Sequence, residues 1–321
     1  MHRRPLLTAA LLGIAGRAVA QPAPWPSRPL TVLVPYVAGG PSDILARAVA
    51  TPLGAALGQP VVVENRPGGN GAVAAQVAAR AAPDGHTLFL AASGILTINP
   101  HVMARLPYDP TRDFAPLTVA IAAPNLLVAH PGFPPRTVAE LIDWLKANPN
   151  RASYGTSGIG SSEHLTMELF AQATGTQLTH VPYSGSAAAV TDLVAGVTQL
   201  SFLNIATVAQ QVQGGSLRAV AVGALRHHPL LPEVPTVADT LPGFEGGSWH
   251  SFVAPAATPE PVLTRIHAAL TECLRLPEVE ARLTRIGFSV VASSRAEMAA
   301  RVAAELARWK DVVRAAGIQP A

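Results

Sequence analysis

The chain alternates short apolar runs with longer stretches in which apolar residues recur every three or four positions. Runs at residues 30–35, 61–64 and 88–91 have the length and composition of β-strands. Residues 44–57 and 72–82, which lie between these runs, have helical spacing. Because strands and helices take turns, the pattern predicts an α/β fold with a mostly parallel sheet and helices on both faces.

The same alternation returns in the middle of the chain. Residues 224–247 interrupt it, since they are rich in proline and predict a long surface connection. The remaining elements are expected at 137–147, 161–174, 187–195, 261–274 and 295–315 for helices, and at 153–155, 179–182, 200–203, 217–222 and 251–254 for strands.

The length of the chain bears on the number of lobes. Its 321 residues exceed what one hydrophobic core usually supports, so we expect two lobes. The chain is expected to cross between them near residues 125–131 and 244–255, which gives a hinge of two segments. The first lobe is then discontinuous, with residues 21–125 and 250–321, and the second contains residues 126–249.

The first twenty residues predict an export signal. Arg3 and Arg4 precede an apolar stretch at 6–15, and small residues at Ala18 and Ala20 fit a signal peptidase site. The stretch is shorter than the roughly 20 apolar residues that span a bilayer. We therefore expect cleavage after Ala20 and a periplasmic location. The sequence leaves open whether the general or the twin-arginine route is used.

Loss of this segment changes the charge of the protein. The full chain has 23 basic and 20 acidic residues, and removal of Arg3, Arg4 and Arg17 leaves the two signs equal. A balanced chain without a basic stripe argues against a nucleic-acid partner. Cys273 is the only cysteine, and its place in an apolar helical pattern predicts a buried structural thiol.

Three loops that join a strand to a helix are the candidates for binding a small organic anion. The first, at 36–43, contains Gly39 and Gly40, whose backbone N–H groups can approach a ligand closely. The second, at 155–162, consists almost entirely of Gly, Ser and Thr. The third, at 181–187, repeats the Pro-Tyr and small-residue pattern of the first.

The position of these loops suggests how an acid would be bound. In open α/β sheets, ligands bind at the carboxyl ends of the strands. The unpaired N–H groups at the start of a helix suit a carboxylate. Two Pro-Tyr loops from different lobes are therefore expected to face each other across a cleft, each with a helix N-terminus and a tyrosine wall.

Other chemistries find little support. Residues 69–74 match a dinucleotide-type glycine pattern, but no acidic residue stands about 20 positions further on. Ser157 lacks the second glycine of a nucleophile elbow. His227 and His228 have no acidic or cysteine neighbours for a metal. We expect no cofactor and no metal. An exported serine hydrolase, with Ser157 or Ser161 beside His164, is the alternative class.

Short strings along nearly the whole mature chain resemble the Bug-type solute receptors of tripartite tricarboxylate transporters. They are PYVAGGPSD at 35–43, VENRPG at 63–68, APDGHTL at 82–88, YGTSG at 154–158 with Ser161, His164 and Leu165, HVPY at 180–183, GSLRA at 215–219, LPEVPT at 231–236 and PGFE at 242–245.

The resemblance implies a periplasmic binding protein of type II that closes on its ligand like a hinge. It implies a di- or tricarboxylate, an acidic amino acid or an aromatic acid as ligand, held partly through ordered water. It further implies a separate membrane permease as partner, a monomeric receptor and no catalysis. A sensor subunit for a membrane kinase is an alternative that the sequence does not separate from transport.

The chain departs from the family pattern at Val37, Ser184, Ala188 and Asn204, and at His250-Ser251, which puts the identity of the ligand in doubt. The residues expected to contact the ligand are Tyr36, Ala38, Gly39, Gly40, Ser42, Asp43, Ser93, Thr156, Ser157, Ser161, His164, Tyr183, Ser184, Gly185, Ala187 and Asn204.

Overall fold

A computed structural model describes residues 25–320, so the predicted signal and its cleavage site lie outside the described residues. The strands are β1 (Leu30–Val34), β2 (Val61–Asn65), β3 (Thr87–Ala92), β4 (Phe114–Ala129), β5 (Ser153–Thr156), β6 (Thr179–Pro182), β7 (Leu200–Asn204), β8 (Arg218–Val222), β9 (Gly247–Pro255) and β10 (Ser289–Val290). The helices are α1 (Pro41–Leu57), α2 (Ala72–Ala79), α3 (Asn99–Val102), α4 (Val138–Ala147), α5 (Ser162–Thr174), α6 (Ser186–Val194), α7 (Ile205–Gln213), α8 (Glu260–Leu274), α9 (Pro277–Thr284) and α10 (Arg295–Ala315).

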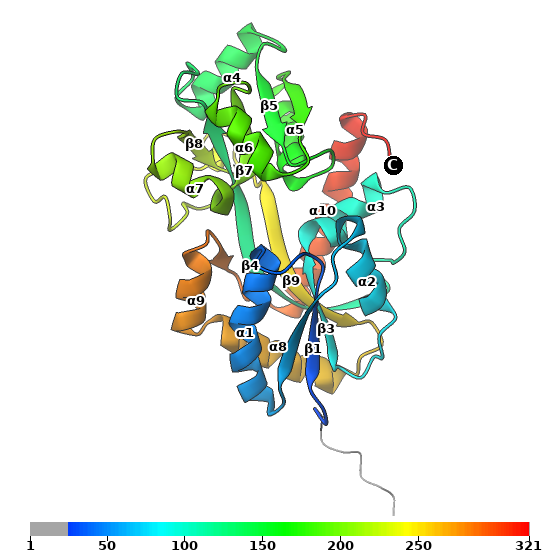
Figure 1. The fold of residues 1–321 in the computed structure, drawn as a ribbon. Helices are drawn as coiled ribbons and strands as arrows, with labels where there is room; N and C mark the ends of the chain where they lie inside the picture. The colour runs from blue at the N-terminus through cyan, green and yellow to red at the C-terminus, as the bar shows by residue number, and fades with distance from the viewer. Residues whose placement is uncertain (1–24, 321) are drawn as a thin grey trace, which may run out of the picture.

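The strands form two groups, which are the two lobes of an α/β protein (Figure 1). In the first lobe β2, β1 and β3 are parallel, and β9, β4 and β10 join them in antiparallel pairs. In the second lobe β6, β5 and β7 are parallel, and β7 and β8 pair antiparallel with the far end of β4. The predicted two-lobe α/β class is confirmed.

The sheets are mixed, which corrects the expectation of mostly parallel sheets. Every antiparallel pair involves β4 or β9, two long strands that run from one lobe towards the other (Figure 1). The sequence pattern did not predict β4, because its 16 residues are buried almost throughout and show no alternation. It also missed α3, α7, α9 and β10, and it extended the helix at 72–82 three residues too far.

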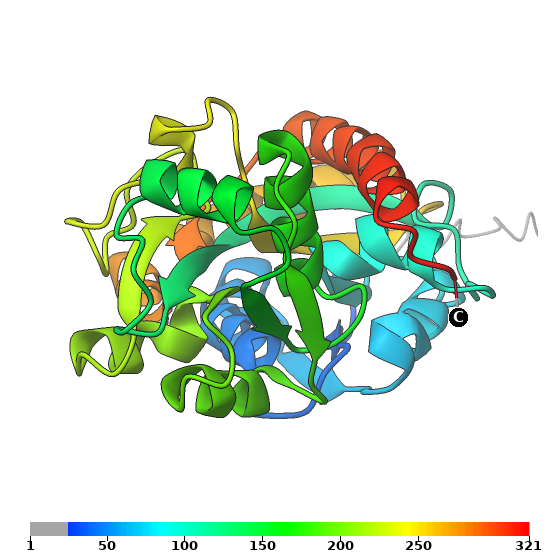
Figure 2. The same cartoon turned by 90° about the horizontal axis from the view of Figure 1, so that it is seen from above.

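Helices cover both faces of each sheet and create separate cores. In the first lobe one core lies under α1 and α8 and another under α2 and α10. In the second lobe one core lies under α4 and α5 and another under α6 and α7. A fifth cluster joins Ile98 of the first lobe and Leu165 of the second to Trp309 on α10. The C-terminal half of α10 therefore packs against both lobes (Figure 2). No helix within residues 25–320 has the length and apolar character to cross a membrane.

Glycines allow the chain to cross tightly between the lobes. The Asn125 N–H donates to the Gly246 carbonyl, and the Gly223 N–H donates to the Asn125 carbonyl. A Cβ on Gly223 would lie 2.7 Å from the Gly246 carbonyl oxygen. A Cβ on Gly246 would lie 2.2 Å from Cγ2 of Thr166 on α5. Larger residues would therefore force the crossing segments and α5 apart.

We predict that Gly246→Ala lowers the free energy of unfolding by about 1–3 kcal/mol, the usual cost of overpacking. Thr166→Ser in the same chain removes Cγ2 and keeps the hydroxyl bonds, so it is expected to restore most of the loss. Gly94→Ala is the control, because its Cβ would only make ordinary contact with Ile98. Urea denaturation measures all three. Equal losses in Gly246→Ala with and without Thr166→Ser would contradict the steric explanation.

Candidate ligand-binding site

The first candidate loop leads from β1 into α1 and is organised by a buried carboxylate. Asp43 Oδ2 accepts from the Gly39 N–H and from Arg47 Nε, both at 2.9 Å. The Arg47 hydrogen bond, together with the Gly39 N–H, lowers the pKa of Asp43 although burial acts in the opposite direction. The N-cap of α1 is Gly40, and no side chain caps this end. The N–H groups of Ser42 and Asp43 therefore remain free among the described residues.

The same loop is tied to the crossing strand β9. The Ser42 hydroxyl lies 3.3 Å from Nδ1 of His250, and both side chains are buried. Burial lowers the pKa of His250 to about 4, so its ring is neutral at pH 7. One residue earlier on β9, the Trp249 N–H donates to Ser93 Oγ at 3.4 Å. Ser42 and Ser93 therefore both contact β9, at the neighbouring residues His250 and Trp249. Ser93 is only 2% exposed, so little of it is open to a ligand.

The second loop, between β5 and α5, contains a carboxylate that the sequence did not single out. Glu163, the second residue of α5, is 4% exposed. Its Oε2 accepts the Ser157 N–H at 2.6 Å, and its Oε1 accepts from Ser186 Oγ at 2.8 Å. Ser186 is the first residue of α6 and belongs to the third loop. Glu163 therefore joins the second and third loops.

The third loop has the free helix end that the sequence predicted. The N-cap of α6 is Gly185, and no side chain caps it, whereas Thr137, Ser161 and Asn204 cap α4, α5 and α7. The N–H groups of the first residues of α6, among them Ala187, have no partner in the described part of the chain. Tyr183 donates to Asp192 at 2.6 Å, and burial raises the pKa of Tyr183 to about 12.

His164 stacks with a second histidine that the sequence analysis did not select. The rings of His164 and His180 are parallel within 10° at 3.9 Å between centroids, and His180 stacks in turn on Tyr154. Nε2 of His180 lies 2.7 Å from the Thr156 hydroxyl, and Nδ1 of His164 accepts the Gly160 N–H at 3.1 Å.

The histidine stack supports the loop and does not form a serine–histidine pair. Ser161 Oγ accepts the His164 N–H as an N-cap, and the described residues include no hydrogen bond from Ser157 or Ser161 to the His164 ring. Burial lowers the pKa of both His164 and His180 to about 4, so neither ring is charged at pH 7. The geometry does not support the hydrolase alternative.

Some predicted residues have their polar groups already bonded inside the protein. Asn204 caps α7 by accepting the Ala206 N–H, and Thr156 faces the histidine stack. Of all the predicted site residues, the exposed ones are Ala38, Gly39, Ser184 and Ala187. The half-exposed ones are Tyr36, Gly40, Ser157, Ser161, Tyr183, Gly185 and Asn204.

Comparison with known proteins shows the family of the chain. The family model described as the tripartite tricarboxylate transporter family receptor matches residues 45–318. The chain belongs to this receptor family. The resemblance drawn from the sequence is therefore confirmed.

Three proteins illustrate how similar the receptor is to known members. BugT of Bordetella pertussis (strain Tohama I) is 32% identical over 322 residues, which cover 99% of each chain. The structure of R. palustris Rpa4515 with adipate has a TM-score of 0.78 and 36% identity, and covers 92% of this chain and 100% of that chain. MatC (Rpa3494) from Rhodopseudomonas palustris with bound malate has a TM-score of 0.73 and 33% identity, with coverage of 90% and 100%.

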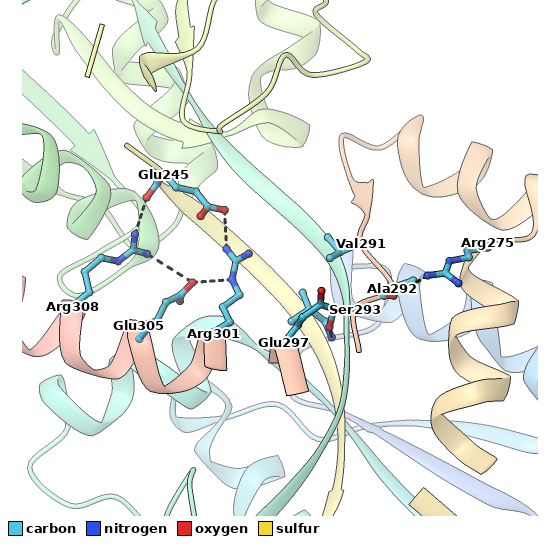
Figure 3. A pocket seen from close by; sticks show the side chains of 11 residues that line it. Glu245, Arg275, Val291, Ala292, Ser293, Glu297, Arg301, Glu305 and Arg308 are labelled. Atoms are coloured by element: carbon cyan, nitrogen blue, oxygen red, sulfur yellow. Dashed lines mark hydrogen bonds and ion pairs between the residues drawn. The ribbon is translucent and has the colours of Figure 1, made fainter. Parts of the chain in front are cut away.

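The receptor also has a cavity that is lined by α10, Glu245 and residues 291–293 (Figure 3). Its volume is about 620 Å³, and none of the predicted site residues lines it. Arg301 bonds Glu245 at 2.9 Å and Glu305 at 3.0 Å, and Arg308 donates to the Glu245 carbonyl at 3.2 Å. Because these positive and negative side chains pair with each other, they stabilise the contact of α10 with the hinge segment at Glu245.

Sequence reasoning missed Glu163, His180 and His250. His180 lies in the HVPY motif and His250 at a departure from the family pattern, but neither position shows what the side chain contacts. Glu163 offered one signal, an acid in the first turn of a helix that starts in a Gly/Ser/Thr loop.

Proposed function

We propose that this protein is a periplasmic receptor that captures a small carboxylate between its two lobes and delivers it to a tripartite permease, without catalysis. The observation that carries the proposal is the pair of uncapped helix ends, α1 and α6, in the two Pro-Tyr loops. Free N–H groups at a helix start bind carboxylates through charge-assisted hydrogen bonds and the helix dipole. Two related structures contain adipate and malate, both carboxylates, which supports the ligand class.

Residues 126–249 are proposed to move as one unit against residues 21–125 and 250–321. Closure would bend β4 near Asn125 and the chain near Gly246, where glycines keep the crossing compact. The proposal includes a monomeric receptor, an export signal cleaved after Ala20 and permease subunits as partners. The sixteen predicted residues remain the proposed contact set, and Glu163 is added to them.

A thermal-shift screen of mono-, di- and tricarboxylates, acidic amino acids and aromatic acids tests the function. A ligand that binds only the folded state at a hundredfold excess over its Kd stabilises the protein by about 2.7 kcal/mol. We expect at least one acid to raise the melting temperature in this way. A shift with a neutral sugar or a metal ion, and none with any acid, would contradict the proposal.

Ala187→Pro tests the contact of the ligand with α6. Proline fits the first turn of a helix and removes one N–H, and α8 of this chain already has Pro261 at its second position. A lost charge-assisted hydrogen bond is worth about 1.5–3 kcal/mol, so the Kd of the acid found in the screen is expected to rise roughly 10- to 100-fold. The control is Ala296→Pro, at the second position of α10. Titration calorimetry measures the Kd of the acid for both variants. Equal Kd values for Ala187→Pro and Ala296→Pro would reject the α6 contact.

A further inference from the structure

Glu163 is a buried carboxylate without a cation beside it. Among the described residues no arginine, lysine or histidine lies within ion-pair distance of it. Its two hydrogen bonds come from the Ser157 amide and the Ser186 hydroxyl. An ionised group in a protein interior is costly unless it is compensated, and such groups concentrate at functional sites. Glu163 lies between two loops of the proposed site, so its charge acts on whatever binds there.

The hydrogen-bond donors nearest to Glu163 are already in use. The Ser157 N–H and the Ser186 hydroxyl are the polar groups that a ligand carboxylate would seek in the second loop and at the start of α6. Both point to the carboxylate of Glu163. A second carboxylate on the ligand would lose these donors and would also meet a negative charge behind them.

The opposite lobe does not supply the missing positive charge. Asp43 occupies the Gly39 N–H, and Arg47 is paired with Asp43. Arg47 is therefore already neutralised by Asp43, and no ion pair links it to Glu163. In the described part of the chain, the donors that remain free include the N–H groups at the starts of α1 and α6 and the hydroxyls of Ser157 and Ser184. All of these donors are neutral, so none of them supplies a cation for a second carboxylate next to Glu163.

The exposed apolar side chains indicate what the rest of the ligand is like. Val37, in the first loop, is 65% exposed, and Ile159, in the second loop, is 68% exposed. Large apolar residues on loops that border a binding site gain free energy when a ligand with an apolar body covers them.

We propose that Glu163 is a specificity-determining residue that makes this receptor select monocarboxylates with an apolar body over dicarboxylates. The inference rests on the proposed function, since it assigns the class of acid to the same site. It separates the ligand into two parts: one carboxylate at the uncapped ends of α1 and α6, and an uncharged chain or ring towards Val37 and Ile159.

Two pairs of acids of matched size test the selection, hexanoate against adipate and benzoate against terephthalate. Titration calorimetry of the full mature chain is expected to give at least about tenfold tighter binding of the monoacid in at least one pair. In Glu163→Gln the Oε1 atom can still accept the Ser157 N–H, and Nε2 can donate to Ser186 Oγ. This variant is therefore expected to fold like the wild type. It is expected to reduce the ratio of the affinity for the monoacid to the affinity for the diacid about fivefold or more.

Controls separate the local charge from other effects. Glu140→Gln removes an exposed acid of the same lobe and is expected to leave the ratio unchanged. Ser186→Ala removes the neutral partner of Glu163 without changing the charge, so the monoacid preference is expected to persist. Melting curves confirm that each variant is folded.

Three outcomes would overturn the inference. The first is tighter binding of the diacids by the wild type. The second is a ratio that is equal in Glu163→Gln and the wild type. The third is no binding of either member of both pairs. In the third case the wider carboxylate screen decides whether the receptor function fails as well, because a hit with another acid would preserve the proposed function and reject only the selection by Glu163.

Discussion

Glu305→Ala is expected to lower the free energy of unfolding by about 3–5 kcal/mol, the usual cost of removing one partner of a buried charge network. The Glu305 carboxylate is the centre of the contact between α10 and the hinge (Figure 3). It accepts from Trp249 Nε1 at 2.8 Å and from Arg301 Nε at 3.0 Å. It also accepts from Trp309 Nε1 and from Thr97 Oγ1, both at 3.4 Å.

Loss of the carboxylate leaves buried donors unpaired. The indole N–H groups of Trp249 and Trp309 would lose their acceptor inside the protein, and both side chains are 1% exposed. Arg301 would keep only Glu245. Each unsatisfied buried group costs about 1–3 kcal/mol, which is why the expected effect is large.

Urea denaturation followed by circular dichroism measures the change. Asp311→Ala is the matched control, because it removes an exposed acid from the same helix, where Asp311 pairs with Arg314 on the surface. Surface pairs of this kind contribute little, so the control is expected to stay close to the wild type. Glu305→Gln is expected to lie between the two. Equal stability of Glu305→Ala and Asp311→Ala would show that the network does not stabilise the fold.

The protein is expected to lose stability steeply as the pH falls from about 6.5 to 4. Burial lowers the pKa of His164, His180 and His250 to about 4, while an unfolded chain keeps each near 6.5. The unfolded state therefore binds more protons in this window. The contribution of each neutral ring is fully present above pH 6.5, and about 3 kcal/mol per histidine is lost by pH 4.

Above about pH 5 the window isolates the histidines from the acids, because Glu260 and Glu297, whose pKa values are lowered by hydrogen bonds, begin to lose their contribution only near their unfolded pKa. The pKa values of Asp43 and Asp109 are lowered below their usual range by hydrogen bonds, so these carboxylates lose their contribution only below about pH 4. Urea denaturation at pH 7.0, 6.0, 5.0 and 4.5 gives the slope of stability against pH. His250→Gln is expected to reduce that slope by an amount that corresponds to up to one proton taken up on unfolding. A flat profile between pH 6.5 and 4.5 would contradict the neutral, buried assignment of the three rings.

The fold class could be predicted because parallel β-α-β units leave a strong local pattern. Short apolar strands and amphipathic helices in the first 92 residues correspond to β1, α1, β2, α2 and β3. β4 could not be predicted in the same way. It is buried on both faces over most of its length, so it lacks alternation, and its pairing partners lie far away in the sequence.

The candidate loops were predictable for a different reason. Their Gly, Ser, Pro and Tyr residues mark turns between strands and helices, and such turns at the carboxyl ends of strands bind ligands in many α/β folds. What these residues bond to was not predictable. The sequence suggested that the Gly39 N–H would approach a ligand, and the structure shows this N–H bonded to the Asp43 carboxylate, which also accepts from Arg47.

By itself, the sequence determined the alternating α/β pattern, the family and the loops in which helix ends meet small residues, because each depends on neighbouring residues in the chain. Only the tertiary structure decided which donors in those loops remain free. Glu163 meets Ser186 across 23 positions and Ser42 meets His250 across 208. Contacts over such distances depend on how the strands are ordered in the sheets, and the local pattern does not contain that order.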